Sequence, residues 1–152
     1  MRRRDKQITD EAGIESILRR ASVCRLALTD GRRPYVVPLC FGYENRTLYF
    51  HAAPEGRKLD LIRANNAVCF EVDIDHELVT GPKACQCSMR YRSVIGFGRA
   101  FLVEDQEEKR RACDLIMRQY SGEPPSYLDE ELQKIVVIRV EIDEMTGKQS
   151  GY

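Results

Sequence analysis

The spacing of hydrophobic residues predicts one helix and then three strands in the first third of the chain. Apolar residues at helical spacing follow the capping side chains of Thr9 and Asp10, and they are Ile14, Ile17, Leu18 and Ala21. Alternating apolar and polar positions then predict strands over residues 23–29, 34–43 and 47–52. Asp30-Gly31 is a typical hairpin turn between the first two strands. Because short turns join all three strands, we expect them to form a meander.

The rest of the chain continues this pattern without a repeat or a linker. It first predicts a short helix from Gly56, a strand over 67–73, an irregular segment over 74–88 and a long strand over 89–104. A helix from Asp105 towards Tyr120, a short helix over 126–134 and a last strand over 136–143 follow. We therefore expect one domain over residues 1–152, mainly β with flanking helices. Its simplest form is an antiparallel sheet that closes into a small barrel.

Two strands contain residues that interrupt a regular sheet. Pro38 cannot donate a hydrogen bond to a neighbouring strand, so it indicates an edge, a bulge or a place where a ligand replaces the neighbour. Gly96 and Gly98 lie on the same side of the long strand, which indicates a sharp bend or the close approach of another backbone or a ligand.

Composition and charge narrow the class of protein. Lys plus Arg and Asp plus Glu each number 24 of the 152 residues, so the formal net charge is zero and nucleic-acid binding is disfavoured. No apolar run approaches the ~20 residues of a membrane span, and the N-terminal arginines lack the apolar segment of a signal peptide. We expect a cytoplasmic protein with no membrane partner. Disulfides are not expected among the scattered cysteines, which are Cys24, Cys40, Cys69, Cys85, Cys87 and Cys113.

The segment HAAPEGRK, residues 51–58, carries the clearest candidate chemistry. A strand ends at His51 and a helix starts near Gly56, so Arg57 and Lys58 lie where helical N–H groups and the helix dipole favour phosphate. The alternative is a solvated pair of cations. His51 could deliver a proton to a substrate or could be a structural histidine.

Two other clusters give weaker signals. Cys85-Gln86-Cys87 has a one-residue gap and no second ligand pair at the usual spacing, so we expect no metal site. The cluster Arg90-Tyr91-Arg92 could bind an anion or could be solvated.

Three segments together resemble a known family. RPYVVPLCFGYENRTLYFHAAPEGRKLDLIRAN, CFEVD and MRYRSVIGFGRA are similar to flavin-binding split-barrel proteins related to pyridoxamine 5'-phosphate oxidase, and most similar to 5-nitroimidazole resistance (Nim-type) proteins. The likeness extends from about Ile8 to Gly147. It implies a six-stranded antiparallel split β-barrel, and a homodimer with two FMN sites at the subunit interface.

The resemblance also implies site residues. Arg57 and Lys58 match two residues of the run that binds the flavin phosphate, and Phe50 and His51 match a pair before it. The strand along the flavin ring corresponds to Val36, Val37, Pro38, Leu39 and Cys40, and further flavin partners correspond to Arg92, Ser93 and the tail residue Lys148. The oxidase's basic residue late in that strand is replaced here by Cys40 or Phe41. This departure argues against phosphorylated pyridoxamine as the substrate.

These features suggest an oxidoreductase that uses FMN, with FAD as an alternative, and transfers electrons from a donor such as NAD(P)H to a small nitro-aromatic or similar acceptor. His51 is then the candidate proton donor. One alternative is a flavin-binding protein without turnover. The other is a haem-binding split barrel with His51 or His76 as the axial ligand.

Overall fold

A computed structural model describes residues 3–122 and 129–152 of the chain. The helices are α1 (Glu11–Arg20), α2 (Arg57–Ala64), α3 (Gln106–Ser121) and α4 (Asp129–Gln133), with 3-10 turns at Arg4–Lys6 and Ala84–Gln86. The strands are β1 (Gln7–Ile8), β2 (Cys24–Thr29), β3 (Pro34–Leu39), β4 (Gly42–Glu44), β5 (Thr47–Ala52), β6 (Ala67–Val79), β7 (Ser88–Val103) and β8 (Val136–Ser150). The chain is therefore mainly β with flanking helices, as expected. The described residues form eight strands, where the resemblance implied six.

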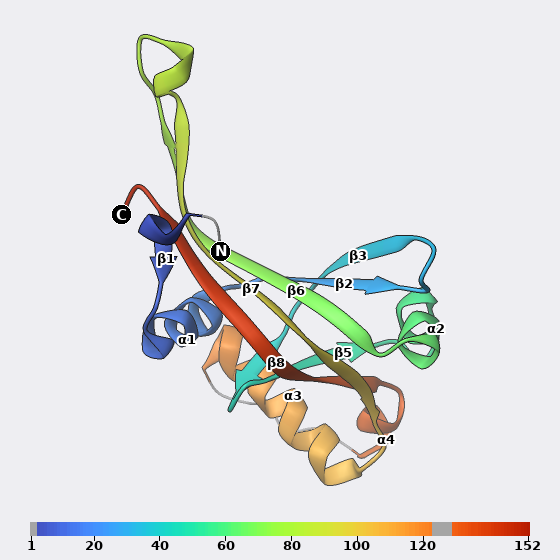
Figure 1. The fold of residues 1–152 in the computed structure, drawn as a ribbon. Helices are drawn as coiled ribbons and strands as arrows, with labels where there is room; N and C mark the ends of the chain where they lie inside the picture. The colour runs from blue at the N-terminus through green and yellow to red at the C-terminus, as the bar shows by residue number, and fades with distance from the viewer. Residues whose placement is uncertain (1–2, 123–128) are drawn as a thin grey trace.

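The strands form one antiparallel sheet in the order β3-β2-β6-β7-β8-β5-β4, and β1 pairs with β8 (Figure 1). Both expected hairpins form, since β2 pairs with β3 and β4 pairs with β5. They do not make one continuous meander, because β3 and β4 lie at opposite ends of the strand order and β5 pairs with β8 on its other side. The expected strand over 34–43 is in fact these two strands, joined only by Cys40 and Phe41. A link this short requires the sheet to curl until its two ends meet. The result is a split barrel, since β3 and β4 are not hydrogen-bonded to each other.

The curled sheet encloses the main hydrophobic core. Alternate residues of β2, namely Cys24, Leu26 and Leu28, point into it, as their sequence pattern predicted. Helix α1 adds Ile14, Ile17 and Leu18 on one face, and its N-cap is the expected Asp10, whose carboxylate accepts a hydrogen bond from the Gly13 N–H. A second cluster forms where α3 and α4 pack on the sheet, from Tyr49, Val103, Ala112, Cys113, Ile116, Leu132 and Val137.

The last turn of α3 holds the point where the two sheet ends meet. The Tyr120 hydroxyl accepts a hydrogen bond from the Phe41 N–H at 3.0 Å and donates one to the Ser22 carbonyl at 2.8 Å. Burial raises the pKa of Tyr120 to about 12, so the hydroxyl keeps its proton at neutral pH. The Gln119 side-chain amide donates to the carbonyls of Leu18 and Ala21 at the end of α1. One turn of helix therefore fixes α1 and the β3–β4 junction together.

Gly96 and Gly98 mark the close approach of a backbone, one of the two predicted explanations. A Cβ on Gly98 would overlap the Glu141 carbonyl of β8, and a Cβ on Gly96 would lie 2.4 Å from the Phe70 ring. The β7–β8 register shifts between Phe97 and Gly98. The glycines thus allow β8 to lie against β7 while the sheet bends.

The segment over 74–88, expected to be irregular, is mostly a β-hairpin. β6 continues to Val79 and β7 begins at Ser88, and together they form an arm that projects from the body (Figure 1). Within one chain both faces of the arm meet solvent, and its sequence shows no regular alternation of apolar and polar residues.

Other boundaries also differ from the sequence predictions. The last strand, expected over 136–143, continues to Ser150, and β1 was not foreseen. The expected helix over 126–134 is seen as α4, and its first residues lie outside the described ranges. No helix within residues 3–122 and 129–152 is long and apolar enough to cross a membrane.

We predict that Tyr120→Phe lowers the free energy of unfolding by ~1–3 kcal/mol, because it leaves the Phe41 N–H and the Ser22 carbonyl without their partner. Urea denaturation measures the change. Tyr49→Phe is the matched control, since the Tyr49 hydroxyl makes no hydrogen bond to any residue in the described part of the chain, and its effect should stay within ~0.5 kcal/mol. Equal losses in both variants would contradict the role given to Tyr120.

Candidate functional site

The start of α2 has the features of an anion site. Its N-cap, Gly56, has φ of 141°, a conformation that side chains rarely adopt, and no atom lies within 4 Å of where a Cβ would stand. No side chain caps this end of the helix, while the N–H groups of Leu59 and Asp60 bond back to the Gly56 carbonyl. The N–H groups of Arg57 and Lys58 have no partner within the helix and are available to a ligand.

Arg57 and Lys58 follow directly, and neither has an ion-pair partner among the described residues. The Arg57 guanidinium lies 5.2 Å from the centroid of the Tyr35 ring, which places the first residue of α2 beside β3. Cations in the first turn of a helix oppose the helix dipole, so an anion bound here would stabilise them. Sequence reasoning found both residues, and the structure adds Tyr35.

The loop between β2 and β3 brings two more cations to the same corner. The backbone N–H groups of Arg32 and Arg33 bond to the Asp30 carboxylate at 2.8 and 3.0 Å. The Arg33 and Arg32 N–H groups lower the pKa of Asp30, and the positive charge of Arg57 lowers it further. Neither arginine side chain has an ion-pair partner in the described ranges. The sequence analysis missed both residues, because only folding of the β2–β3 hairpin places them beside α2.

β3 offers an open backbone edge next to this corner. It is the terminal strand of the sheet, so no described strand pairs with its outer edge, and the expectation that Pro38 lies on an edge strand is confirmed. Val36, Pro38 and Cys40 are exposed, whereas Val37 and Leu39 pack against the core. Free N–H and C=O groups along β3 can therefore bind the polar edge of a flat ligand.

His51 lies at the exposed end of β5 on the side that faces α3. It lines a pocket of about 170 Å³ with Cys113, Ile116, Met117 and Ile135. The other described residues that line it are a cysteine, two isoleucines and a methionine, so the His51 imidazole faces a largely apolar wall. Phe50 points the other way, into the core, where its side chain is fully buried against Phe41. Only the backbone of Phe50 could therefore contact a cofactor.

The remaining predicted residues lie along β7 and β8, towards the end of these strands that is far from α2. Arg92 pairs with Asp75 and lies over the Tyr152 ring, Ser93 is buried, and the Lys148 ammonium lies 5.3 Å from the centroid of the Tyr91 ring. Ser93 and Lys148 are register partners on β7 and β8. Within one chain this group is separated from the end of α2 by the part of β6 from Ala67 to Ile74, the register partner of Arg92, which is roughly 23 Å at ~3.3 Å per residue.

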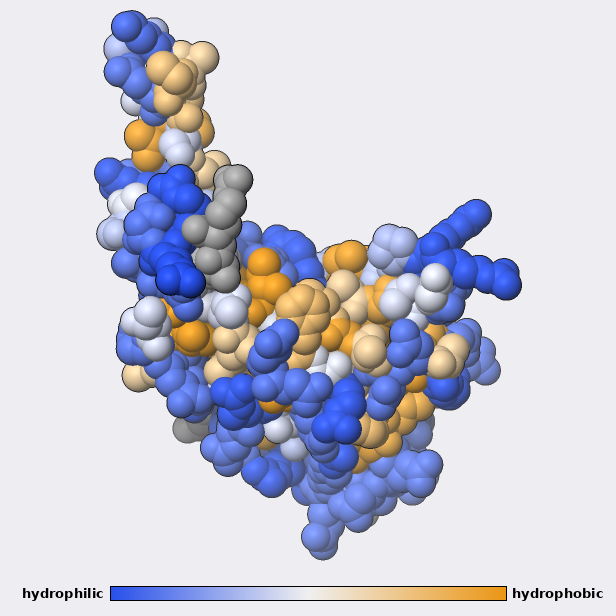
Figure 2. Space-filling view, in the orientation of Figure 1, coloured by the Kyte–Doolittle hydropathy of each residue, from blue (hydrophilic) through white to orange (hydrophobic). Residues whose placement is uncertain are grey.

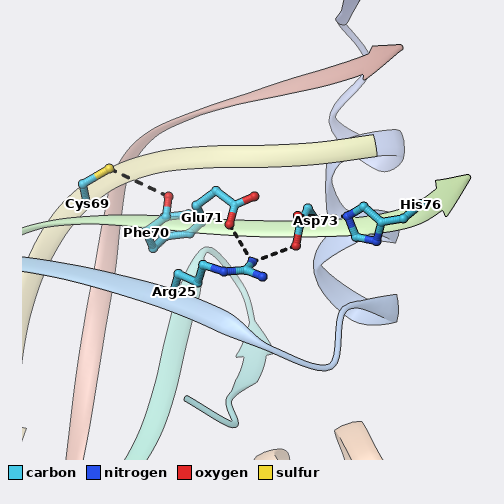
Figure 3. A network of polar contacts seen from close by, with 6 residues as sticks. All are labelled: Arg25, Cys69, Phe70, Glu71, Asp73 and His76. Atoms are coloured by element: carbon cyan, nitrogen blue, oxygen red, sulfur yellow. Dashed lines mark hydrogen bonds and ion pairs between the residues drawn. The ribbon is translucent and has the colours of Figure 1, made fainter. Parts of the chain in front are cut away.

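A polar network lies on the outer face of the sheet between these two regions. Figure 3 shows the Arg25 guanidinium between Glu71 and Asp73, at 2.9 and 2.7 Å, with Cys69 and His76 farther along β6. Burial raises the pKa of Glu71. Burial also acts to raise the pKa of Asp73, but hydrogen bonds from Arg25 and His76 outweigh it, so the net shift is downward.

His76 and the paired cysteines form no metal centre in the part of the chain described. The His76 Nε2 is hydrogen-bonded to Asp73 at 2.9 Å, which engages it on the protein itself. Cys85 and Cys87 are exposed at the arm tip, and no group of three metal-ligating side chains occurs among the described residues.

Comparison with known proteins agrees with this fold. The profile of the pyridoxamine 5'-phosphate oxidase family matches residues 10–149. The chain belongs to this family. A search of curated proteins finds no match.

Solved structures similar to this chain are known. A candidate 5-nitroimidazole antibiotic resistance protein from Bacteroides thetaiotaomicron is 43% identical, covers 94% of this chain and 86% of its own, and gives a TM-score of 0.84. An FAD-binding protein from Mycobacterium smegmatis is 26% identical over 96% of this chain and 98% of its own, with a TM-score of 0.66. An FAD- and haem-binding protein from the same organism, 21% identical, shares the fold with a TM-score of 0.85 over 97% of this chain and 74% of its own.

Proposed function

We propose that the protein is a flavin-dependent oxidoreductase that binds FMN and reduces a small nitro-aromatic or similar acceptor. The observation that carries the proposal is the start of α2. There, unpaired cations, free N–H groups and a glycine N-cap lie beside the open edge of β3. A ligand with a phosphate at one end and a flat polar ring at the other fits both features.

The residues of this corner divide the binding between them. Arg57 and Lys58 hold the phosphate through charge-assisted hydrogen bonds, with Arg32 and Arg33 adding positive charge. Backbone groups of β3 from Val37 to Cys40 bond the ring edge, and Val36 and Pro38 shield it from water. When bound, the flavin supplies hydride or electron transfer, which no side chain of the protein can perform.

FMN is favoured over FAD because adjacent cations at one helix start suit a single terminal phosphate. FAD is the alternative cofactor, because a similar protein from Mycobacterium smegmatis binds FAD. The mass of the flavin released on denaturation separates the two cofactors.

The apolar pocket beside His51 suits a neutral acceptor. No cation lies among the described residues of its wall, so it does not favour a phosphorylated or carboxylated compound. Its volume of about 170 Å³ is that of a site for one small aromatic ring. Identity of 43% with a candidate nitroimidazole resistance protein supports an acceptor of this kind. His51 delivers the proton that accompanies the electrons, and a donor such as NAD(P)H renews them.

A homodimer would bring the separated groups together. Arg92, Ser93 and Lys148 lie at one end of the sheet, and Arg57 and Lys58 lie at the other end. A two-fold axis that exchanges these ends places Arg92, Ser93 and Lys148 of one copy beside the α2 start of its partner. The flavin site is then completed across the subunit interface.

We predict that Arg57→Ala combined with Lys58→Ala empties the flavin site and leaves the fold intact. Bound flavin is measured from its absorbance near ~450 nm relative to protein, and folding from circular dichroism. Arg63→Ala in the last turn of α2 is the control, because Arg63 pairs with Asp60. Full flavin occupancy in the double variant, or a Soret band in place of flavin bands in the natural protein, would refute the assignment.

We predict that the flavin-loaded protein is a dimer in light scattering, because one curled sheet has too little depth to bury a flavin ring alone. A monomer that retains stoichiometric flavin would disprove the shared site.

We predict that His51→Ala keeps its flavin but slows reduction of a nitro-aromatic acceptor at neutral pH by ~10²–10⁴-fold, the usual worth of a placed proton donor. Stopped-flow reoxidation of the reduced protein gives the rate per flavin. His76→Ala, at the other histidine, should leave that rate unchanged. An unaltered rate with a lower melting temperature in His51→Ala would make His51 a structural residue.

A further inference from the structure

The arm formed by the ends of β6 and β7 stands apart from the rest of the chain. From Glu77 outwards its strands pair only with each other, as Glu77 with Arg90, Leu78 with Met89 and Val79 with Ser88. No residue between Asp75 and Arg90 is buried. An isolated two-stranded hairpin is only marginally stable in water, so this arm needs a surface to lie against.

The arm carries an apolar pair in solvent. Leu78 is 65% exposed and Met89 is 43% exposed, and they are directly opposite each other across the two strands. Figure 2 shows apolar side chains on the arm among hydrophilic ones. Burying this pair would stabilise a contact by the hydrophobic effect.

Contacts at the base of the arm fix the direction in which the arm leaves the body. Asp75 has φ of 57° within a bulge between Ile74 and Glu77, and its carboxylate pairs with Arg20 of α1 and Arg92 of β7. The Tyr152 hydroxyl donates to the Asp75 carbonyl at 2.7 Å, and the Arg92 guanidinium lies 4.0 Å from the centroid of the Tyr152 ring. These contacts hold a conformation that aspartate adopts at a cost, so the arm leaves the body at a set angle.

The outer face of the same sheet is also uncovered. Val36 is 57% exposed, Ile95 44% and Phe97 50%. Val36, Ala27, Cys69 and Phe97 are register partners on β3, β2, β6 and β7, so they form one row of apolar residues across four neighbouring strands. In Figure 2 apolar side chains gather between the arm and the β2–β3 end of the molecule. Since β6 and β7 build both the face and the arm, a partner on the face also meets the arm.

A second copy of the chain is the occupant that fits both surfaces. The net charge of the chain is zero, so two copies do not repel each other. The face carries both signs, with Arg25 beside Glu71 and Asp73, and so can pair with itself. Stacked sheets lie ~10 Å apart, and the eight residues from Asp75 to Pro82 extend up to ~26 Å, so the arm can cross that gap and continue along its neighbour.

The arm and α2 lie at opposite ends of β6 (Figure 1). A two-fold axis that exchanges these ends carries each arm to the α2 end of the other copy. Exposed apolar residues are present there, at Pro34, Pro54 and Ala64.

We propose that the arm of each copy packs against α2 and the β2–β3 loop of a second copy, burying Leu78 and Met89 and covering its partner's anion-binding corner. The proposal rests on the dimer proposed above and does not require flavin. It gives the arm two tasks, since the same contact joins the subunits and excludes water from the phosphate end of the site.

The first test is the strength of self-association. Leu78→Asp combined with Met89→Asp should raise the dimer dissociation constant by more than ~100-fold, because two buried apolar side chains per copy are lost. The control is Thr80→Asp combined with Ser88→Asp, which adds the same charge to exposed polar positions of the arm. Analytical ultracentrifugation gives both constants, and circular dichroism verifies the fold. Equal dissociation constants in the two double variants would overturn the proposal.

The second test locates the arm. Leu78→p-benzoylphenylalanine is prepared in isotopically light and heavy chains, which are mixed in equal amounts, irradiated and digested. Cross-links that join a light chain to a heavy one, at residues 30–34 or 53–64, support the proposal. Links only within one chain, links between two arms, or none at all would overturn it. A natural protein that is monomeric at every concentration contradicts the dimer itself, whereas a dimer with unlinked arms contradicts only the arm's role.

Discussion

Cys40 and Phe41 connect two strands that lie at opposite ends of the sheet, and most of the architecture follows from this short link. The sheet must curl until β3 and β4 meet, which creates the interior that the apolar residues fill. The curl also leaves β3 without a neighbour on its outer edge, because the chain continues into β4 at the far end. Tyr120 holds the junction by bonding Phe41 and Ser22. The same constraint therefore closes the core and opens an edge for a ligand.

Charge pairing sets the candidate site apart from the rest of the surface. Arg25, Arg90 and Arg92 are each paired with a carboxylate on a neighbouring strand or bulge, and Arg139 is paired with Glu108 of α3. Exposed pairs of this kind contribute little to stability, but they engage these guanidinium groups on the protein itself. Four positive side chains that have no ion-pair partner among the described residues, Arg32, Arg33, Arg57 and Lys58, lie where α2 starts and the β2–β3 loop turns. A neutral chain thus presents a local positive field suited to phosphate.

The outer face and the arm connect assembly with this site. The sheet bends around Gly96 and Gly98 because β8 approaches them closely, while Ile95 and Phe97 on alternate positions point outwards and remain exposed. One strand, β7, thereby contributes to the core, to the uncovered face and to the arm. A partner that covers the face would also receive the arm and the Arg92 end of the sheet. On this view, binding and self-association share one surface.

Local signals in the sequence determined the helices, most strands and the Arg57–Lys58 part of the candidate anion site. Asp10 and Asp105 cap helices where predicted, and Arg57 and Lys58 were found because their position at a helix start is a property of neighbouring residues. The pairing of β5 with β8, the junction at Cys40 and the roles of Arg32 and Arg33 were decided only by the tertiary structure. Alternation shows which face of a strand is buried, but not which strand lies beside it. The arm was missed for a different reason, because a hairpin that is exposed on both faces of its own chain shows no regular hydrophobic period.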